Sequence, residues 1–125
     1  MSFSFSSQNK LKSKADIDLV FSEGSFLKVP GFSLVYRAQD AKGSCGVRVG
    51  FSIGKKVQPR AVDRNKTKRI MRESFRLLFP KNLSLSSVSY DFMIVCNEKA
   101  VPSFALVSDK IKSLLLSFSE IIKNG

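Results

Sequence analysis

The stretch that most constrains the fold runs from Pro59 to Pro80 and reads PRAVDRNKTKRIMRESFRLLFP. On a helix each residue advances by about 100°, and six polar residues of this stretch then share an arc of roughly 140°. They are Arg64, Asn65, Lys68, Arg69, Arg72 and Arg76. The opposite side holds Thr67, Ile70, Met71, Ser74, Leu77 and Leu78, with Phe75 at the boundary. This predicts an amphipathic helix that Asp63 caps, that ends at or before Pro80, and that has one face in a core.

The polar face of this predicted helix carries charges of one sign. It holds five cations and no acid, whereas a solvated helix face usually mixes signs. The cations begin in the first turn, where the helix dipole already presents partial positive charge and disfavours Lys and Arg. Cations beside the unpaired N–H groups of a helix start favour a phosphate ligand. An ordinary solvated basic face is the alternative interpretation.

The charge of the whole chain supports phosphate binding. The 125 residues include 21 Lys and Arg against 10 Asp and Glu, which gives a net charge of +11. Nine of the cations and only two of the acids lie between Lys55 and Arg76, so the charge is concentrated in a patch. Such an excess is typical of proteins that bind nucleic acid or an anionic membrane surface.

Length and composition predict one domain over residues 1–125, large enough to bury roughly two thirds of its unfolded surface. The opening MSFSFSSQNK lacks the basic and apolar regions of a signal peptide, and no apolar run is long enough to span a bilayer. Cys45 and Cys96 are too few and too far apart for a disulfide framework or a zinc site. We therefore expect a cytoplasmic protein with no membrane partner, whose residues 1–9 are flexible.

A short helix is predicted near the start of the chain. Ser13 and Asp16 have a spacing like that of a capping box, and Gly24 is a typical residue just after a helix end. The residues between them place Ile17 and Phe21 on one side. We expect this helix to cover a sheet, with Ile17 and Phe21 as core residues.

Four strands and a last helix are predicted from the remaining residues. Alternation predicts strands at 26–29, 32–38 and 46–53, the last two forming an antiparallel pair with a polar outer face. The continuous apolar run 90–96 predicts an interior strand buried on both faces. Ser103 begins a last helix whose core positions keep helical spacing. These positions are Phe104, Val107, Ile111, Leu114, Leu115, Phe118, Ile121 and Ile122. The order αβββαβα predicts an α+β sandwich in which helices pack on one sheet.

The residues taken alone describe a binder without an active site of its own. The chain has no histidine, the commonest general base and metal ligand. The carboxylates that could hold magnesium are Asp16, Asp18 and Glu23, but they lie on one short helix, where Asp16 and Asp18 point about 200° apart. No phosphate loop or zinc motif is present, so a nuclease made of protein alone is disfavoured. RNA is favoured over DNA because Phe32, Tyr36 and Phe51 of the predicted sheet would form a stacking platform beside the basic helix.

Several stretches in combination resemble the bacterial ribonuclease P protein component. RNKTKRIMRESFR, from Arg64 to Arg76, is similar to the family signature RNRxKRxxRExFR. The likeness includes RVGFSIGKK from Arg48 to Lys56, DIDLVF from Asp16 to Phe21, and YDF from Tyr90. It covers about residues 11–122, and the ordered combination is more specific than any one stretch.

The resemblance implies a single αβββαβα domain with a four-stranded mixed sheet. It also implies a left-handed crossover from the third strand through the basic helix to the fourth, although parallel crossovers are nearly always right-handed. The family protein is the small subunit of an endonuclease that removes the 5′ leader of precursor transfer RNA. The partners would be the ribonuclease P RNA, which carries out catalysis with bound Mg²⁺, and the precursor. The protein would broaden the substrate range and lower the magnesium requirement, with no obligate protein partner and no cofactor of its own.

The resemblance also assigns roles to residues. RNA binding is implied for Arg64, Asn65, Lys66, Lys68, Arg69, Arg72 and Arg76 and, upstream, for Lys55 and Lys56. Lys66 replaces an Arg of the signature and keeps its charge but not its bidentate fork. A leader cleft between the first helix and the sheet would include Ile17, Phe21 and Tyr36. The strand aligns only to within one residue, which leaves Ser33 and Val35 open as alternatives to Tyr36. No residue is assigned a catalytic or metal-binding role. A structural RNA-binding protein, such as a ribosomal or assembly component, is the alternative function.

Overall fold

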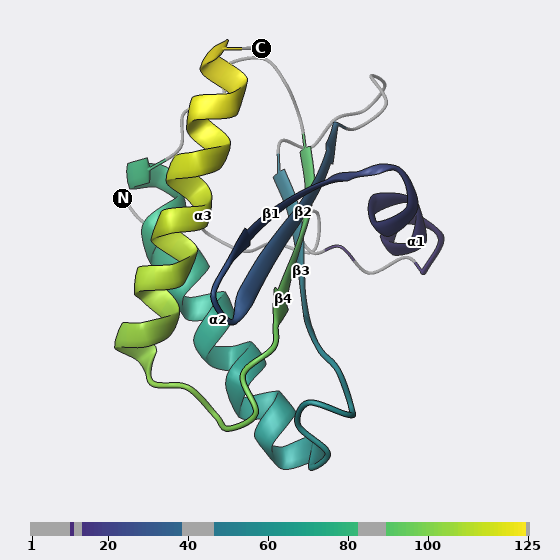
Figure 1. The fold of residues 1–125 in the computed structure, drawn as a ribbon, viewed down its shortest axis with the longest axis vertical. Coiled ribbons are helices and arrows are strands. Elements are labelled where there is room, and N and C mark those ends of the chain that lie inside the picture. Colours follow the sequence, from purple (N-terminus) through teal and green to yellow (C-terminus); the bar gives the residue numbers. More distant parts are fainter. Residues whose placement is uncertain (1–10, 12–13, 39–46, 83–89, 125) are drawn as a thin grey trace.

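The computed structural model describes residues 11, 14–38, 47–82 and 90–124. Within these residues the helices and strands follow the expected order αβββαβα (Figure 1). They are α1 (Lys14–Glu23), β1 (Ser25–Val29), β2 (Phe32–Ala38), β3 (Val47–Ile53), α2 (Ala61–Asn82), β4 (Tyr90–Cys96) and α3 (Phe104–Asn124). The predictions for residues 1–9, for Ser13 and for Cys45 lie outside the described residues.

The four strands form one mixed sheet in the order β1-β2-β4-β3. β2 pairs antiparallel with β1 and with β4, whereas β3 pairs parallel with β4. The predicted antiparallel pair of residues 32–38 and 46–53 is therefore wrong, because β4 lies between these two strands. The reason is the apolar run of β4, in which Phe92, Met93 and Ile94 are all buried. Such a strand needs a neighbour on each side and cover on each face.

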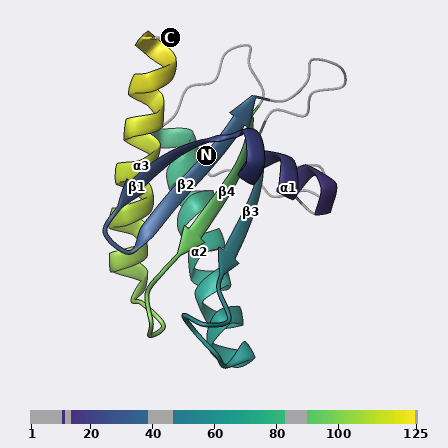
Figure 2. The same ribbon diagram turned by 45° about the vertical axis from the view of Figure 1, so that its right-hand side comes forward.

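The helices cover the two faces of the sheet unequally. α2 and α3 pack side by side on one face, and α1 lies on the other (Figures 1 and 2). With α1 toward the viewer, as in Figure 2, β3 and β4 both run downward and α2 connects them behind the sheet. The chain moves from right to left in this crossover, which makes it left-handed, as the family resemblance implied.

The main core lies between the sheet and the α2–α3 layer. Phe32, Leu34 and Phe92 from the sheet meet Met71 and Phe75 from α2 there. Phe75 is fully buried rather than at the boundary of the helix face, because its ring packs edge to face on Phe51 and Phe92.

Phe118 of α3 occupies the centre of an aromatic cluster within this core. Its ring centroid lies 4.9 Å from the centroids of Tyr36, Tyr90 and Phe92, each in an edge-to-face arrangement. These contacts attach the second half of α3 to β2 and β4, the two middle strands of the sheet.

A smaller core lies under α1, where a polar outer face of the sheet was expected. Val20 of α1 packs there on Val35 of β2 and Met93 of β4, with Leu11 beside them and Ile17 at the edge. Val35 and Val20 have no exposed surface, so the middle of this face of β2 is apolar and covered, whereas Ser33 and Arg37 on either side of Val35 are polar as expected. The sequence pattern did not predict this smaller core, because a single valine in a strand does not show which element will cover that valine.

Phe21 does not join this smaller core. It is 37% exposed, so its predicted role as a core residue is wrong.

Gly50 of β3, the strand beside β4, has no room for a side chain. A Cβ atom there would come within 2.5 Å of the sulfur of Met93. The N–H of Leu11 donates to the carbonyl of Val49 at 3.1 Å, so the chain itself fills the space beside Gly50.

The helix ends agree with the sequence in part. The N–H of Gly24 donates to the carbonyl of Val20 at 2.8 Å, and the hydroxyl of Ser103 accepts from the N–H of Leu106 at 3.1 Å. The first and last turns of α3 leave Phe104 and Ile121 44% and 39% exposed, so these two are not core residues.

The two ends of α2 differ from the prediction. The carbonyl of Arg60 accepts from the N–H of Arg64, and the first helical residue is Ala61, two residues before Asp63. Asp63 therefore lies within the first turn and is not the N-cap residue. Its negative charge there interacts favourably with the helix dipole. α2 also continues past Pro80 to Asn82. These two residues are less than one turn, and a helix end can vary by that much.

Two phenylalanines of α3 give a matched test of the core. Phe118→Ala should reduce the free energy of unfolding by about 3–5 kcal/mol, because the ring is fully buried among other aromatic rings. Phe104→Ala should cost less than about 1 kcal/mol, because nearly half of its side chain is exposed. Urea denaturation of both variants measures the difference, and equal losses would contradict the placement of α3.

Candidate nucleic-acid interface

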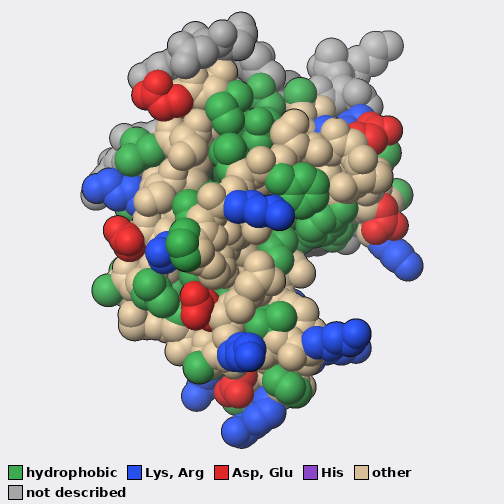
Figure 3. Space-filling view, in the orientation of Figure 1, with side chains coloured by type: hydrophobic (Ala, Val, Ile, Leu, Met, Phe, Trp, Pro, Cys, Tyr) green, Lys and Arg blue, Asp and Glu red, His purple; other side chains and the backbone are tan. Residues whose placement is uncertain are grey.

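The polar face of α2 is exposed at its first three turns. Asn65, Lys66, Arg69 and Arg72 are exposed and Lys68 is half-buried, whereas Thr67, Met71 and Ser74 on the other face are buried. The two faces predicted from helical spacing are therefore confirmed. Figure 3 shows blue side chains gathered at the lower end of the molecule, where α2 begins. The exposed face carries cations close to the N–H groups of a helix start.

The connection between β3 and α2 extends this face. The carbonyl of Gly54 accepts from the N–H groups of Val57 and Gln58, at 3.1 and 3.0 Å, so the chain turns directly after β3. Lys55 and Lys56 lie exposed in this turn. We call the combined set the basic surface. It consists of Lys55, Lys56, Arg64, Asn65, Lys66, Lys68, Arg69 and Arg72.

Arg64 is the member of the basic surface that also supports the local structure. Its guanidinium donates to the carbonyls of Gln58 and Pro59, both at 2.9 Å. These bonds hold the connection against the first turn of α2. Arg64 is half-buried as a result, and the remaining N–H groups of its guanidinium are available to a ligand.

A buried side-chain amide also fixes the connection between β3 and α2. The side chain of Gln58 is 1% exposed and donates to the carbonyls of Glu98 and Ala100, at 2.8 and 3.3 Å. Its oxygen accepts from the hydroxyl of Thr67 at 2.9 Å. The amide thus joins the loop after β3, helix α2 and the loop after β4. Sequence reasoning missed Gln58, because a glutamine in a basic loop has the pattern of a solvated residue.

Arg76, also predicted to bind RNA, has a partner within its own helix. It forms an ion pair with Glu73, one turn away. The hydrogen bond between them raises the pKa of Arg76 above its ordinary value and lowers that of Glu73. Because its charge is met locally, we do not count Arg76 in the basic surface.

On the opposite side of the sheet, α1 is held by ion pairs to two strands. Arg48 of β3 donates to both carboxylate oxygens of Asp91 on β4, at 2.8 and 2.7 Å, and to Asp16 of α1 at 3.1 Å. Arg37 of β2 donates to Glu23 of α1 at 3.1 Å. The bond to buried Asp91 is the main cause that raises the pKa of the Arg48 guanidinium. These bonds fix the start of α1 over β3 and β4 and its end over β2.

These ion pairs also fix which side of α1 faces which part of the sheet. Asp16 and Glu23 lie on nearly the same side of the helix, and Phe21 is about 150° around the axis from them. The acids point toward the row of cross-strand neighbours Arg37, Asp91 and Arg48. Phe21 therefore lies along the other side of α1, above the part of the sheet that the helix leaves open.

That open part is a row of four cross-strand neighbours, one from each strand. We call it the open strip: Lys28, Ser33, Val95 and Ser52. Lys28 is exposed and the other three are half-buried. Residues paired across a sheet point to the same face, and Ser33 lies two residues from Val35, which packs under α1. The strip is therefore on the α1 side. In Figure 3 the surface is indented below α1, between α1 and the lower end with the blue side chains.

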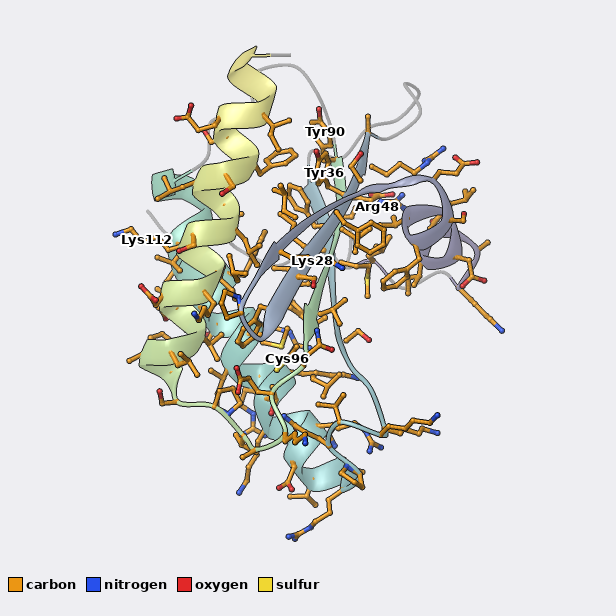
Figure 4. The ribbon with its side chains drawn as sticks, viewed as in Figure 1. Lys28, Tyr36, Arg48, Tyr90, Cys96 and Lys112 are labelled. Atoms are coloured by element: carbon orange, nitrogen blue, oxygen red, sulfur yellow. The ribbon has the colours of Figure 1, made fainter. Side chains whose placement is uncertain are left out.

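The three residues predicted for a cleft at this place have different positions. Phe21 is exposed along α1, and Ile17 is half-buried at the edge of the smaller core. Tyr36 is on the other face of the sheet: its ring packs on those of Tyr90 and Phe118 (Figure 4). The assignment of Tyr36 to the α1 side is thus wrong. Of the two alternatives that the alignment left open, both Ser33 and Val35 face α1.

The stacking platform expected beside the basic helix is also absent from the described surface. Phe32 is buried and Phe51 packs on Phe75, so both belong to the main core with Tyr36. Alternation along a strand separates its side chains into two faces. It does not show which face a helix will cover, and the aromatic face is the one that α2 and α3 cover.

Comparison with known proteins identifies the family. A family model described as Ribonuclease P matches residues 5–119 of this chain. The chain belongs to the ribonuclease P protein family. A ribonuclease P protein component of Chlorobaculum tepidum is 33% identical over 118 residues, with 83% of this chain and 75% of that protein covered. One from Buchnera aphidicola is 28% identical, with 90% and 92% covered.

Solved structures agree with this ribonuclease P assignment. The RNase P protein from Thermotoga maritima superimposes with a TM-score of 0.70 at 26% identity, with 86% of this chain and 96% of that chain covered. An RNase P protein from Staphylococcus aureus has a TM-score of 0.70 at 22% identity, with 86% and 92% covered, and supports the fold alone. None of the described helices has the length and hydrophobicity that a membrane span requires.

The two acids that bind Arg48 should differ in their effect on stability. Asp91→Asn should reduce the free energy of unfolding by about 2 kcal/mol or more, because the Asp91 side chain is 3% exposed and loses a bidentate bond. Asp16→Asn should cost less than about 1 kcal/mol, because its side chain is 36% exposed. Urea denaturation compares the two variants. A larger loss for Asp16→Asn would show that α1, rather than the strands, depends on Arg48.

Proposed function

We propose that this chain is the protein subunit of ribonuclease P. In this proposal the basic surface binds the catalytic RNA, and the open strip with Phe21 holds the single-stranded 5′ leader of precursor transfer RNA. The observation that carries the proposal is the basic surface itself. It is a helix start whose exposed charged side chains are all positive, in a chain of the ribonuclease P protein family.

The chemistry of the basic surface suits phosphate groups. Exposed Lys and Arg side chains neutralise phosphates, and a helix start adds unpaired N–H groups and the positive end of the dipole. Asn65 is the one amide on the exposed face of α2 within the described residues, so little base reading is expected. This surface therefore fits a large folded RNA bound through its backbone.

The chemistry of the open strip suits a single strand. Ser33 and Ser52 offer hydroxyl groups, Val95 offers a small apolar contact, and Phe21 offers a partly exposed ring. Unpaired bases bind aromatic rings and small polar groups in this way. Three spacings between four strands give the strip a length of about 14 Å, enough for a short single-stranded segment.

The described residues offer no suitable site for magnesium. Asp16 and Asp91 both bind the Arg48 guanidinium, and no group of three His, Cys, Asp or Glu residues that could hold a metal occurs among the described residues. In our proposal Mg²⁺ is bound by the RNA subunit and the precursor, where it supplies the chemistry of cleavage. The chain's own residues bind and orient the two RNAs and lower their mutual repulsion, which would reduce the magnesium requirement and admit more substrates.

Leader cleavage tests the proposed function directly. We expect the protein to stimulate cleavage of a precursor transfer RNA by the matching catalytic RNA at low millimolar magnesium, and the protein alone to cleave nothing. Stimulation should fade as magnesium is raised, because the added cation replaces the screening that the protein provides. Tight RNA binding without stimulation would instead support a structural RNA-binding protein.

The salt dependence of binding tests the basic surface. Contact with about six phosphates predicts a slope of roughly −4 to −5 in a plot of log affinity for the catalytic RNA against log salt concentration. Arg72→Ala should make this slope shallower by about 0.7 to 0.9 without changing the melting temperature, because Arg72 is exposed. A slope shallower than about −2 for the unaltered protein would contradict phosphate binding by this surface.

Removal of Arg76 together with Glu73 provides a matched control for Arg72→Ala. The double change Arg76→Ala and Glu73→Ala removes an ion pair on the same helix and leaves the net charge unchanged. RNA affinity should then change less than two-fold. A loss as large as that of Arg72→Ala would show that Arg76 contacts the RNA despite its pairing with Glu73.

A further inference from the structure

β1 presents a half-exposed aromatic ring at the edge of the sheet. Phe26 is 51% exposed, although its cross-strand neighbour Val35 is fully buried. The difference arises because α1 packs on β2 and β4, so its cover ends before β1. Phe26 therefore lies on the α1 side of the sheet, beside the smaller core but outside it.

The alternation of β1 fixes the direction of its side chains. Leu27 and Val29 pack against the main core, on the side of α2 and α3. Phe26 and Lys28 must then face the α1 side, where Lys28 is the end of the open strip. An exposed ring and an exposed cation thus lie two residues apart on one face of β1, about 7 Å along the strand.

The open strip has cations at both ends, and Lys28 is the cation at the β1 end. At the other end β3 leaves the sheet after Ser52 and Ile53, and Lys55 and Lys56 follow at once. Between these cations Ser33, Val95 and Ser52 are neutral and half-buried. A strand of RNA that crosses from β3 to β1 would meet positive charge where it enters and where it leaves.

We propose that Phe26 and Lys28 form an additional binding site for single-stranded RNA, in which the ring of Phe26 stacks on a base and the ammonium group of Lys28 binds a neighbouring phosphate. This site shares Lys28 with the open strip, would hold the leader nucleotides that reach β1, and rests on the proposed function. A ring beside a cation is the combination that binds single strands without reading their sequence. A second copy of this chain is a less suitable occupant, because two chains of net charge +11 repel each other and Lys28 opposes pairing of the β1 edge.

The test uses the complete complex of protein, catalytic RNA and precursor, with two leader lengths. One leader ends over β2, before it reaches Phe26 and Lys28, and the other reaches across β1. Phe26→Ala should weaken binding of the long-leader precursor about five-fold or more and leave the short-leader precursor unchanged. Lys28→Ala should weaken the same precursor and make its salt slope shallower by about 0.7.

Two residues of α3 provide matched controls. Phe104 is 44% exposed and Lys112 is exposed, and α3 lies on the other side of the sheet (Figure 4). Phe104→Ala and Lys112→Ala make the same chemical changes away from the strip and should leave both precursors unaffected. Equal losses for both leader lengths, or equal losses in the controls, would overturn the proposal.

A variant of Phe21 separates this proposal from the proposed function. If Phe21→Ala weakens leader binding while Phe26→Ala does not, the leader is held by the open strip and the additional site is overturned. If leader length has no effect on the unaltered protein and Phe21→Ala changes nothing, leader binding itself fails, and the additional site fails with it.

Fluorescence gives a direct readout of stacking. The chain has no tryptophan, so Phe26→Trp introduces a single reporter at the site. Its emission should be quenched when the long-leader precursor binds and not when the short-leader precursor binds, whereas Phe104→Trp should respond to neither. A Phe26→Trp signal that instead depends on protein concentration without RNA would identify the site as an interface between two copies and overturn the proposal.

Discussion

The structure depends on the burial of β4 on both faces and along both edges. Its apolar residues require β2 on one side, β3 on the other, and helices above and below. Because β3 runs parallel to β4, the chain must cross over through α2, and the start of α2 comes to lie beyond the end of the sheet. The polar residue of β4, Asp91, holds Arg48 and through it α1. One strand thus places both the basic surface and the open strip.

The sheet keeps these two surfaces apart. The cations of α2 belong to the layer on one face, whereas Phe21 and the open strip are on the other. Lys55 and Lys56 lie in the connection between them, where β3 leaves the sheet and α2 begins. Two RNAs could therefore occupy the protein together, with these lysines near both. This arrangement fits a protein whose effect is to bring two polyanions into contact.

The sequence predicted features that depend on local spacing. Helical periodicity gave the two faces of α2, and the apolar run 90–96 gave an interior strand. The partners of β2 were not predictable in the same way, because strand pairing joins residues far apart in the chain. The same limit explains Tyr36, since alternation separates two faces without showing which one α1 covers. Arg48 and Gln58 were missed because polar residues bound to buried partners have the same local pattern as solvated ones.

The most direct test of two separate RNA surfaces is photochemical cross-linking within the complete complex. A photoreactive group attached through Ser52→Cys would report on the open strip, and one attached through Lys66→Cys would report on the basic surface. We expect the group at position 52 to cross-link to the leader of the precursor, and the group at position 66 to the catalytic RNA. Cross-links from both positions to the same RNA segment would contradict the division of the protein into two surfaces.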